Sequence, residues 1–138
     1  VAHGLAGVPV QTPLYAVIDL LGNAAAVSLM AGAVPPVSLG NPEPFLDRAT
    51  STLSGFDLVP VSGSVVLSRD NLLASHKDPS GQDAYGVVFG NGPMRRFPTG
   101  AYFEIKLEQT SSDNNDDGLA IGATTRFPRA PQKTLFEV

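Results

Sequence analysis

The chain has 138 residues, of which 43% are hydrophobic and 16% are charged, as is usual for a globular protein. Its 14 glycines and 12 prolines favour short elements joined by turns over long helices, so we expect an all-β fold. The net charge of −4 at pH 7 argues against nucleic-acid binding, and the absence of cysteine excludes disulfides, thiolate catalysis and a RING finger. No apolar run reaches the ~18 to 20 residues that would span a bilayer, and we expect a cytoplasmic protein.

The first predicted strand covers residues 14–20, which are rich in β-branched and aromatic types and end at the turn pair Gly22-Asn23. A second strand over Ala25 to Met30 is predicted to complete a hairpin with it. Residues 31–60 are rich in proline and lack sustained periodicity, which indicates a linker between two modules. Phe45, Leu46, Leu53 and Phe56 are exceptions to this character, and we expect them to pack on a neighbouring surface.

From Val61 onward the pattern predicts a β meander. Strands are predicted over residues 64–68, 72–75 and 84–89, with a turn at Arg69-Asp70-Asn71 and a break at Gly90-Asn91-Gly92-Pro93. Residues 101–108 form the clearest predicted strand, because Phe103, Ile105 and Leu107 alternate with charged residues, and residues 118–125 form the last one. The tripeptide Arg95-Arg96-Phe97 is predicted to lie in a loop.

The acidic run Asp113 to Gly118 fits the opening of an EF-hand calcium loop. The fit ends at position 12, where Thr124 stands in place of the bidentate glutamate, and neither flank has a helical pattern. An acidic hairpin loop is the favoured interpretation, and a loosely held surface cation remains the alternative. We predict no dedicated metal site and no cofactor.

Residues for catalysis are sparse. Ser68, His76, Asp78 and Asp83 include the types found in hydrolytic triads, but no strained turn motif surrounds any serine. Glu104 and Glu108 share one strand face, but four residues of strand separate them by ~13 Å, too far for an acid and base pair. We therefore predict that the protein is not an enzyme.

The ordered blocks resemble the neuralized homology repeat, an all-β interaction module related to SPRY domains. There are five blocks, and in chain order they are Pro13 to Gly22, Val65 to Asp70, Tyr85 to Pro93, Tyr102 to Glu108 and Gly118 to Thr125. In that family the first of these normally comes last, so the resemblance implies the end of one repeat (1–30), a linker (31–60) and the start of the next repeat (61–138). The family's middle strands and its tryptophan are missing. We therefore predict unpaired sheet edges, covered by another chain, a neighbouring repeat or a second copy.

The resemblance implies an antiparallel β-sandwich whose loops at one end bind short peptide segments of a partner protein, including partners recruited for a ubiquitin ligase. The candidate partner contacts that follow are Asp83, Tyr85, Asn91, Arg95, Arg96 and Phe97. Arginine and aromatic residues are enriched at the centres of protein interfaces, which supports the last three. The alternatives are a structural subunit of a large assembly and, from another class, a small hydrolase or sugar-binding β-sandwich.

Overall fold

The computed structural model describes residues 12–20, 22–36, 53–58, 63–77, 86–97, 100–111 and 118–125. Every regular element within these ranges is a β-strand, and all paired strands run antiparallel, which confirms the all-β expectation for this part of the chain. The strands are β1 (Tyr15–Asp19), β2 (Ala24–Leu29), β3 (Val65–Ser68), β4 (Leu73–His76), β5 (Val87–Phe89), β6 (Arg95–Phe97), β7 (Gly100–Tyr102), β8 (Ile105–Thr110) and β9 (Ala120–Thr124).

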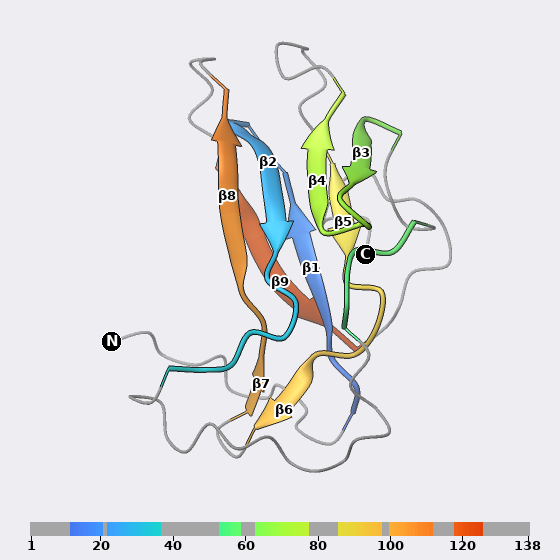
Figure 1. The fold of residues 1–138 in the computed structure, drawn as a ribbon, viewed down its shortest axis with the longest axis vertical. Helices are drawn as coiled ribbons and strands as arrows, with labels where there is room; N and C mark the ends of the chain where they lie inside the picture. The colour runs from blue at the N-terminus through green and yellow to red at the C-terminus, as the bar shows by residue number, and fades with distance from the viewer. Residues whose placement is uncertain are drawn as a thin grey trace.

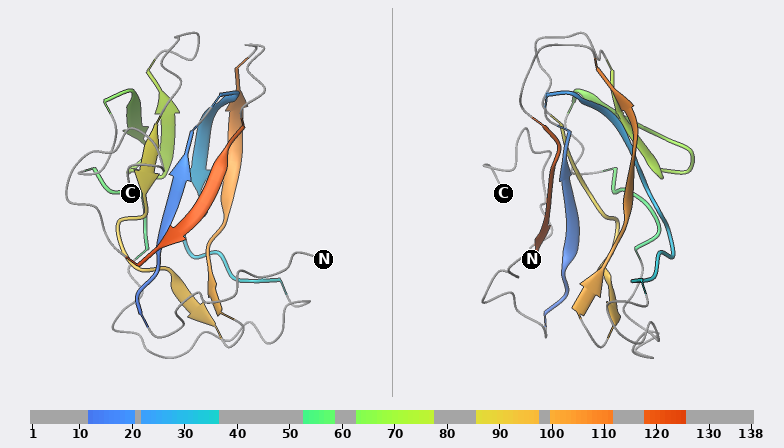
Figure 2. Two further views of the ribbon diagram at one scale, coloured as in Figure 1. Left: turned by 180° about the vertical axis from the view of Figure 1, so that it is seen from behind. Right: turned by 90° about the vertical axis from the view of Figure 1, so that its left-hand side faces the viewer.

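The strands form a three-stranded sheet in the order β5-β1-β9, a four-stranded sheet in the order β3-β4-β2-β8 and a two-stranded sheet of β6 and β7. The two larger sheets pack face to face, consistent with a β-sandwich, and the small sheet lies at one end (Figures 1 and 2). β1 and β2 come from residues 1–30, yet each is flanked on both edges by strands from residues 61–138. The assignment of these segments to successive repeats stays a prediction.

The predicted hairpin of the first two strands is wrong, because β1 and β2 lie in different sheets and the turn at Gly22-Asn23 leads from one sheet to the other. Every residue of β2 is buried, so this strand occupies a central position and takes neighbours on both edges. The meander is also wrong beyond β3 and β4, since β4 and β5 belong to different sheets. β8 and β9 are likewise separated and do not form the hairpin expected on either side of the acidic run.

The strand predicted over residues 101–108 divides into β7 and β8, which have different partners. β7 pairs with β6 in the small sheet, whereas β8 pairs with β2 in the four-stranded sheet. The change of partner interrupts the strand at Phe103 and Glu104. The loop predicted for Arg95-Arg96-Phe97 is wrong too, because these residues form β6.

The core between the larger sheets is built from alternate residues of the central strands. β1 contributes Ala16 and Ile18, and β2 contributes Val27 and Leu29, because residues two apart on a strand share a face. The rest of the buried cluster consists of Leu20, Phe56, Val65, Ala74, Val88 and Met94. On the opposite face of the three-stranded sheet, Val17, Val87 and Phe89 form a second buried cluster, so this sheet is covered on both faces.

Residues 53–58, which we call the closing segment, belong to the predicted linker but join the sandwich. The Phe56 amide donates to the Asn71 carbonyl of the β3–β4 turn at 2.7 Å, and the Asp57 amide donates to the Phe89 carbonyl of β5 at 2.8 Å. The Phe56 side chain is 1% exposed. The closing segment thus bonds to both larger sheets and places one aromatic ring in the core.

Candidate functional site

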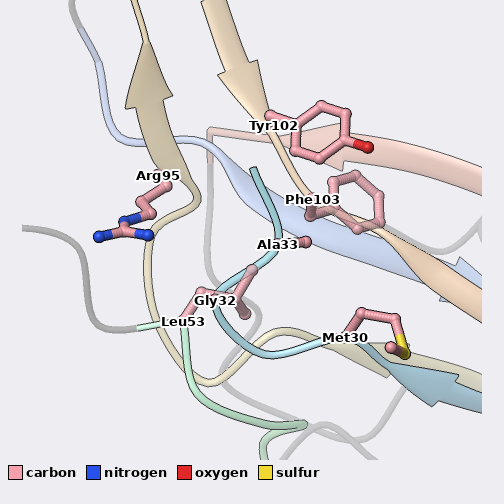
Figure 3. A pocket seen from close by; sticks show the side chains of 7 residues that line it. All are labelled: Met30, Gly32, Ala33, Leu53, Arg95, Tyr102 and Phe103. Atoms are coloured by element: carbon pink, nitrogen blue, oxygen red, sulfur yellow. The ribbon is translucent and has the colours of Figure 1, made fainter. Parts of the chain in front are cut away.

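A pocket lies at the end of the molecule that carries β6 and β7 (Figures 1 and 3). Its lining comes from separate parts of the chain and consists of Met30, Gly32, Ala33, Leu53, Arg95, Tyr102 and Phe103. The volume is about 240 Å³. Because pockets for small-molecule ligands usually measure ~300 to 1,000 Å³, this one suits a side chain of a polypeptide better than a free ligand.

One wall of the pocket is the turn that follows β2. The Met30 amide donates to the Glu104 carbonyl at 2.9 Å, and the Ala33 amide donates back to the Met30 carbonyl at 3.2 Å. Gly32 has a φ of 77°, a left-handed conformation that favours glycine, and it allows the chain to reverse here. The turn leaves the Met30 side chain 44% exposed at the pocket.

Leu53 of the closing segment forms another wall, and Asn91 holds the segment in place. The Asn91 Oδ1 accepts hydrogen bonds from the amides of Ser54 at 2.9 Å and Gly55 at 3.2 Å, and its Nδ2 donates to the Ser54 hydroxyl at 3.0 Å. A Cβ on Gly90 would lie 2.4 Å from the Leu53 side chain. Asn91, a predicted partner contact, therefore fixes the closing segment, which contributes Leu53 to the pocket.

Arg96 and Phe97 support the small sheet. The Arg96 guanidinium donates to the Thr12 carbonyl, and the Phe97 ring meets the Tyr102 ring edge to face, with centroids 6.3 Å apart. Phe97 is buried, so a direct contact with a partner would need its ring to leave this position. Through these contacts Arg96 and Phe97 hold β6 in place. Arg95 lies on the same strand, opposite Tyr102 of β7.

Arg95 brings a positive charge to a pocket whose other lining residues are mainly of apolar types. In the described ranges no carboxylate lies within ion-pair distance of its guanidinium. Loss of solvation and the nearby Glu104 carboxylate raise the pKa of Tyr102, whose hydroxyl donates to that carboxylate at 3.3 Å. The phenol therefore stays protonated at neutral pH. An arginine with several N–H donors beside apolar walls can bind a carboxylate next to a large apolar group.

The structure brings one of the six predicted contacts, Arg95, into the pocket, and it places Asn91, Arg96 and Phe97 around it. Asp83 and Tyr85 lie outside the described residues. The sequence pointed to no role for Met30, Leu53, Tyr102 or Phe103 in a site. The adjacent aromatic pair Tyr102-Phe103 was the available signal. Successive side chains of a strand point to opposite faces of the sheet, so the two rings cannot both face the core if they lie in one strand.

The residues considered for catalysis do not come together in the described part of the chain. His76 is buried, and its Nε2 lies 2.9 Å from the Leu20 carbonyl oxygen, a hydrogen bond that holds the ring inside the sandwich. Within the described ranges no three His, Asp or Glu side chains gather so as to hold a metal ion. Asp78, Asp83 and the acidic run Asp113 to Asp117 lie outside those ranges.

No helix among the described residues has the length and apolar character to cross a membrane. Comparisons with protein-family models, with curated proteins and with solved structures give no match to this chain.

Proposed function

We propose that this chain is a non-catalytic protein-recognition domain, and that it binds a short segment of a partner protein through the pocket at the β6–β7 end. The observation that carries the proposal is the pocket itself, whose lining combines Arg95 with Met30, Leu53 and Phe103. Aromatic and methionine side chains with an arginine are the composition typical of the centre of a protein interface.

The pocket composition defines the segment that it would accept. A large apolar side chain of the partner would pack between Met30, Leu53 and Phe103, and a neighbouring carboxylate would pair with Arg95. The chain as a whole carries a net charge of −4, which repels strongly acidic segments. A segment with one carboxylate and one or two large apolar side chains therefore fits best.

The resemblance to the neuralized homology repeat agrees with this proposal, since that SPRY-like family binds peptide segments at one end of its sandwich. By the same resemblance, the bound partner would be a protein recruited for a ubiquitin ligase. A RING finger would not lie on this chain, because it needs cysteine ligands and the chain has no cysteine.

A peptide selection tests the proposal. Random linear dodecapeptides displayed on phage are selected on the full chain, and the binders are synthesised and measured by fluorescence anisotropy. We expect enriched sequences to combine a carboxylate with a large apolar residue. The Arg95→Glu and Met30→Ala variants should each weaken their binding by about tenfold or more, as is usual for a central interface residue.

Lys77→Glu is the matched control for the charge reversal. Lys77 is exposed and directly follows β4, at the end of the sandwich far from β6 and β7 (Figure 1). Binding by this variant should stay within about twofold of the unmodified chain. Equal losses in Lys77→Glu and Arg95→Glu would show a general charge effect and would refute the pocket as the binding site.

A further inference from the structure

The two methionines of the chain differ in their access to solvent. Because the chain has no cysteine, Met30 and Met94 carry its only sulfur atoms. Oxidants convert the thioether of methionine to a sulfoxide, which reductases can convert back. Met30 is 44% exposed, whereas Met94 is 5% exposed. The same oxidisable group therefore occurs once in an open position and once in a buried one.

The backbone around Met30 keeps its side chain at the pocket. Leu29, the last residue of β2, belongs to the buried core, and successive side chains of an extended chain point in opposite directions. The Met30 amide donates to the Glu104 carbonyl at 2.9 Å, and the Met30 carbonyl accepts from the Ala33 amide at 3.2 Å. Burying the Met30 side chain would require these hydrogen bonds to break. Figure 3 labels Met30 and its sulfur among the residues that line the pocket.

Met94 has the opposite environment. Its side chain belongs to the buried cluster that includes Ile18 and Val88, and its amide donates to the Leu14 carbonyl at 2.7 Å. An oxidant can reach this sulfur only when the core opens locally, but it can reach Met30 in the folded chain. The fold thus directs oxidation to the pocket.

We propose that Met30 is a site of reversible oxidation by peroxides, and that its sulfoxide weakens binding of the partner segment at the pocket. The second part rests on the proposed function. In the reaction with hydrogen peroxide, the O–O bond breaks and an S–O bond forms on Met30. The sulfur is oxidised, and the peroxide is reduced to water, which carries both of its hydrogens. A reductase reverses the step with a dithiol, which becomes a disulfide while the sulfoxide oxygen leaves as water.

The sulfoxide acts on binding because it changes the polarity of one pocket wall. The large apolar side chain of the partner would pack against Met30, and a sulfoxide there would be buried without a matching donor. A buried polar group that lacks a hydrogen bond costs free energy. In the unbound chain the exposed sulfoxide remains hydrated, so the stability of the fold should not change. Oxidation therefore lowers affinity and leaves the folded domain intact.

Peroxide treatment of the full chain tests both parts. The reaction is stopped with catalase at intervals, and peptide mapping by mass spectrometry follows the sulfoxide at each methionine. We expect Met30 to react about tenfold faster than Met94 or more in the folded chain, and the two rates to become similar in concentrated urea. Thermal unfolding followed by circular dichroism should give the same melting temperature before and after oxidation of Met30.

Binding is measured by fluorescence anisotropy with the synthetic peptides selected on the pocket. Their affinity should fall by about tenfold after oxidation of Met30. Methionine sulfoxide reductases A and B with dithiothreitol should restore it, because together they reduce both epimers of the sulfoxide.

Two leucine variants are the matched controls. Met30→Leu removes the sulfur from the pocket, so its affinities before and after peroxide should agree within about twofold, whatever its starting affinity. Met94→Leu conserves core volume and should keep the full response of the parent to peroxide.

Equal oxidation rates of the two methionines in the folded chain would overturn Met30 as a selective site. Peptides that bind the oxidised and reduced chains equally would overturn the effect on binding alone, and so would a loss of affinity that persists in Met30→Leu. A selection that yields no pocket-binding peptide would refute the proposed function and the effect on binding together, while the oxidation rates would still decide whether Met30 is a selective site.

Discussion

Glu108 is the residue on which several polar interactions converge, on the outer face of the four-stranded sheet. Its carboxylate accepts a hydrogen bond from Lys106 at 2.8 Å and another from the Ser28 hydroxyl, and Arg69 lies 3.8 Å away. The hydrogen bond from Lys106, and then that from Ser28, lower the pKa of Glu108. The predicted charged face of β8 therefore has Lys106 and Glu108 paired with each other.

The lowered pKa predicts the direction of a pH dependence. A carboxylate whose pKa is lower in the folded state stabilises the fold above its unfolded pKa, near the usual value of 4.5, and loses this contribution as the pH falls through the folded pKa. We expect Glu108→Gln to lower the urea midpoint at about pH 7 and to lower it by less at about pH 3. An equal loss at both pH values would show that the charge of Glu108 is not the cause.

At the scale of the element, the turn between β3 and β4 has an unusual backbone. Arg69, Asp70 and Asn71 have φ values of 51°, 55° and 65°, so three successive residues with side chains adopt the left-handed conformation. That conformation costs about 1 to 2 kcal/mol for most residues and less for Asn and Asp, whose side chains bond locally. The pair Asp70-Asn71 thus explains why the sequence tolerates this turn.

Asp70→Val tests the turn. A β-branched residue at a positive φ is strained, and we expect the free energy of unfolding to fall by about 1 to 2 kcal/mol in urea titration. Asp70→Gly removes the Cβ and should stay within about 0.5 kcal/mol of the parent. If the two variants lose the same stability, the cause is the lost carboxylate and not the backbone.

The sequence located strands well but not their partners. β1, β2 and β9 could be found because their apolar and β-branched runs are local signals. Their pairing depends on which strands must be buried on both faces, and that is decided by contacts far apart in the chain. β6 was missed because its two arginines and one phenylalanine show no alternation.

The pocket was even less visible in the sequence. Of its lining residues, only Arg95 was expected in a site, from the family resemblance and from its residue type. Met30, Leu53 and Phe103 meet there because a turn, the closing segment and the β7–β8 junction end at the same place. The spacing of these residues along the chain does not indicate that they are close together in the fold.

For the molecule as a whole, Phe56 is the side chain through which the closing segment joins the two larger sheets. We expect Phe56→Ala to cost about 3 to 5 kcal/mol, the usual range for a buried phenylalanine. In the parent chain, unfolding followed by far-ultraviolet circular dichroism and by tyrosine fluorescence should be a single coincident transition, because both sheets share the contact with Phe56.

Leu58→Ala is the control from the same segment. Leu58 is exposed, and its loss should change stability by no more than about 0.5 kcal/mol. Two separate transitions in the parent chain would contradict the view that the sheets unfold together, and so would a small effect of Phe56→Ala.

The pairing of β1 with β9 has a consequence for biosynthesis. Tyr15 pairs with Thr124, so the first described strand receives one of its neighbours only after all the residues between the two strands have been made. At about 5 to 20 residues per second, the ribosome exposes an apolar β1 for several seconds before β9 emerges. During that interval the strand has an open edge, and chaperone binding to nascent chains should be strongest before residue 124 leaves the exit tunnel.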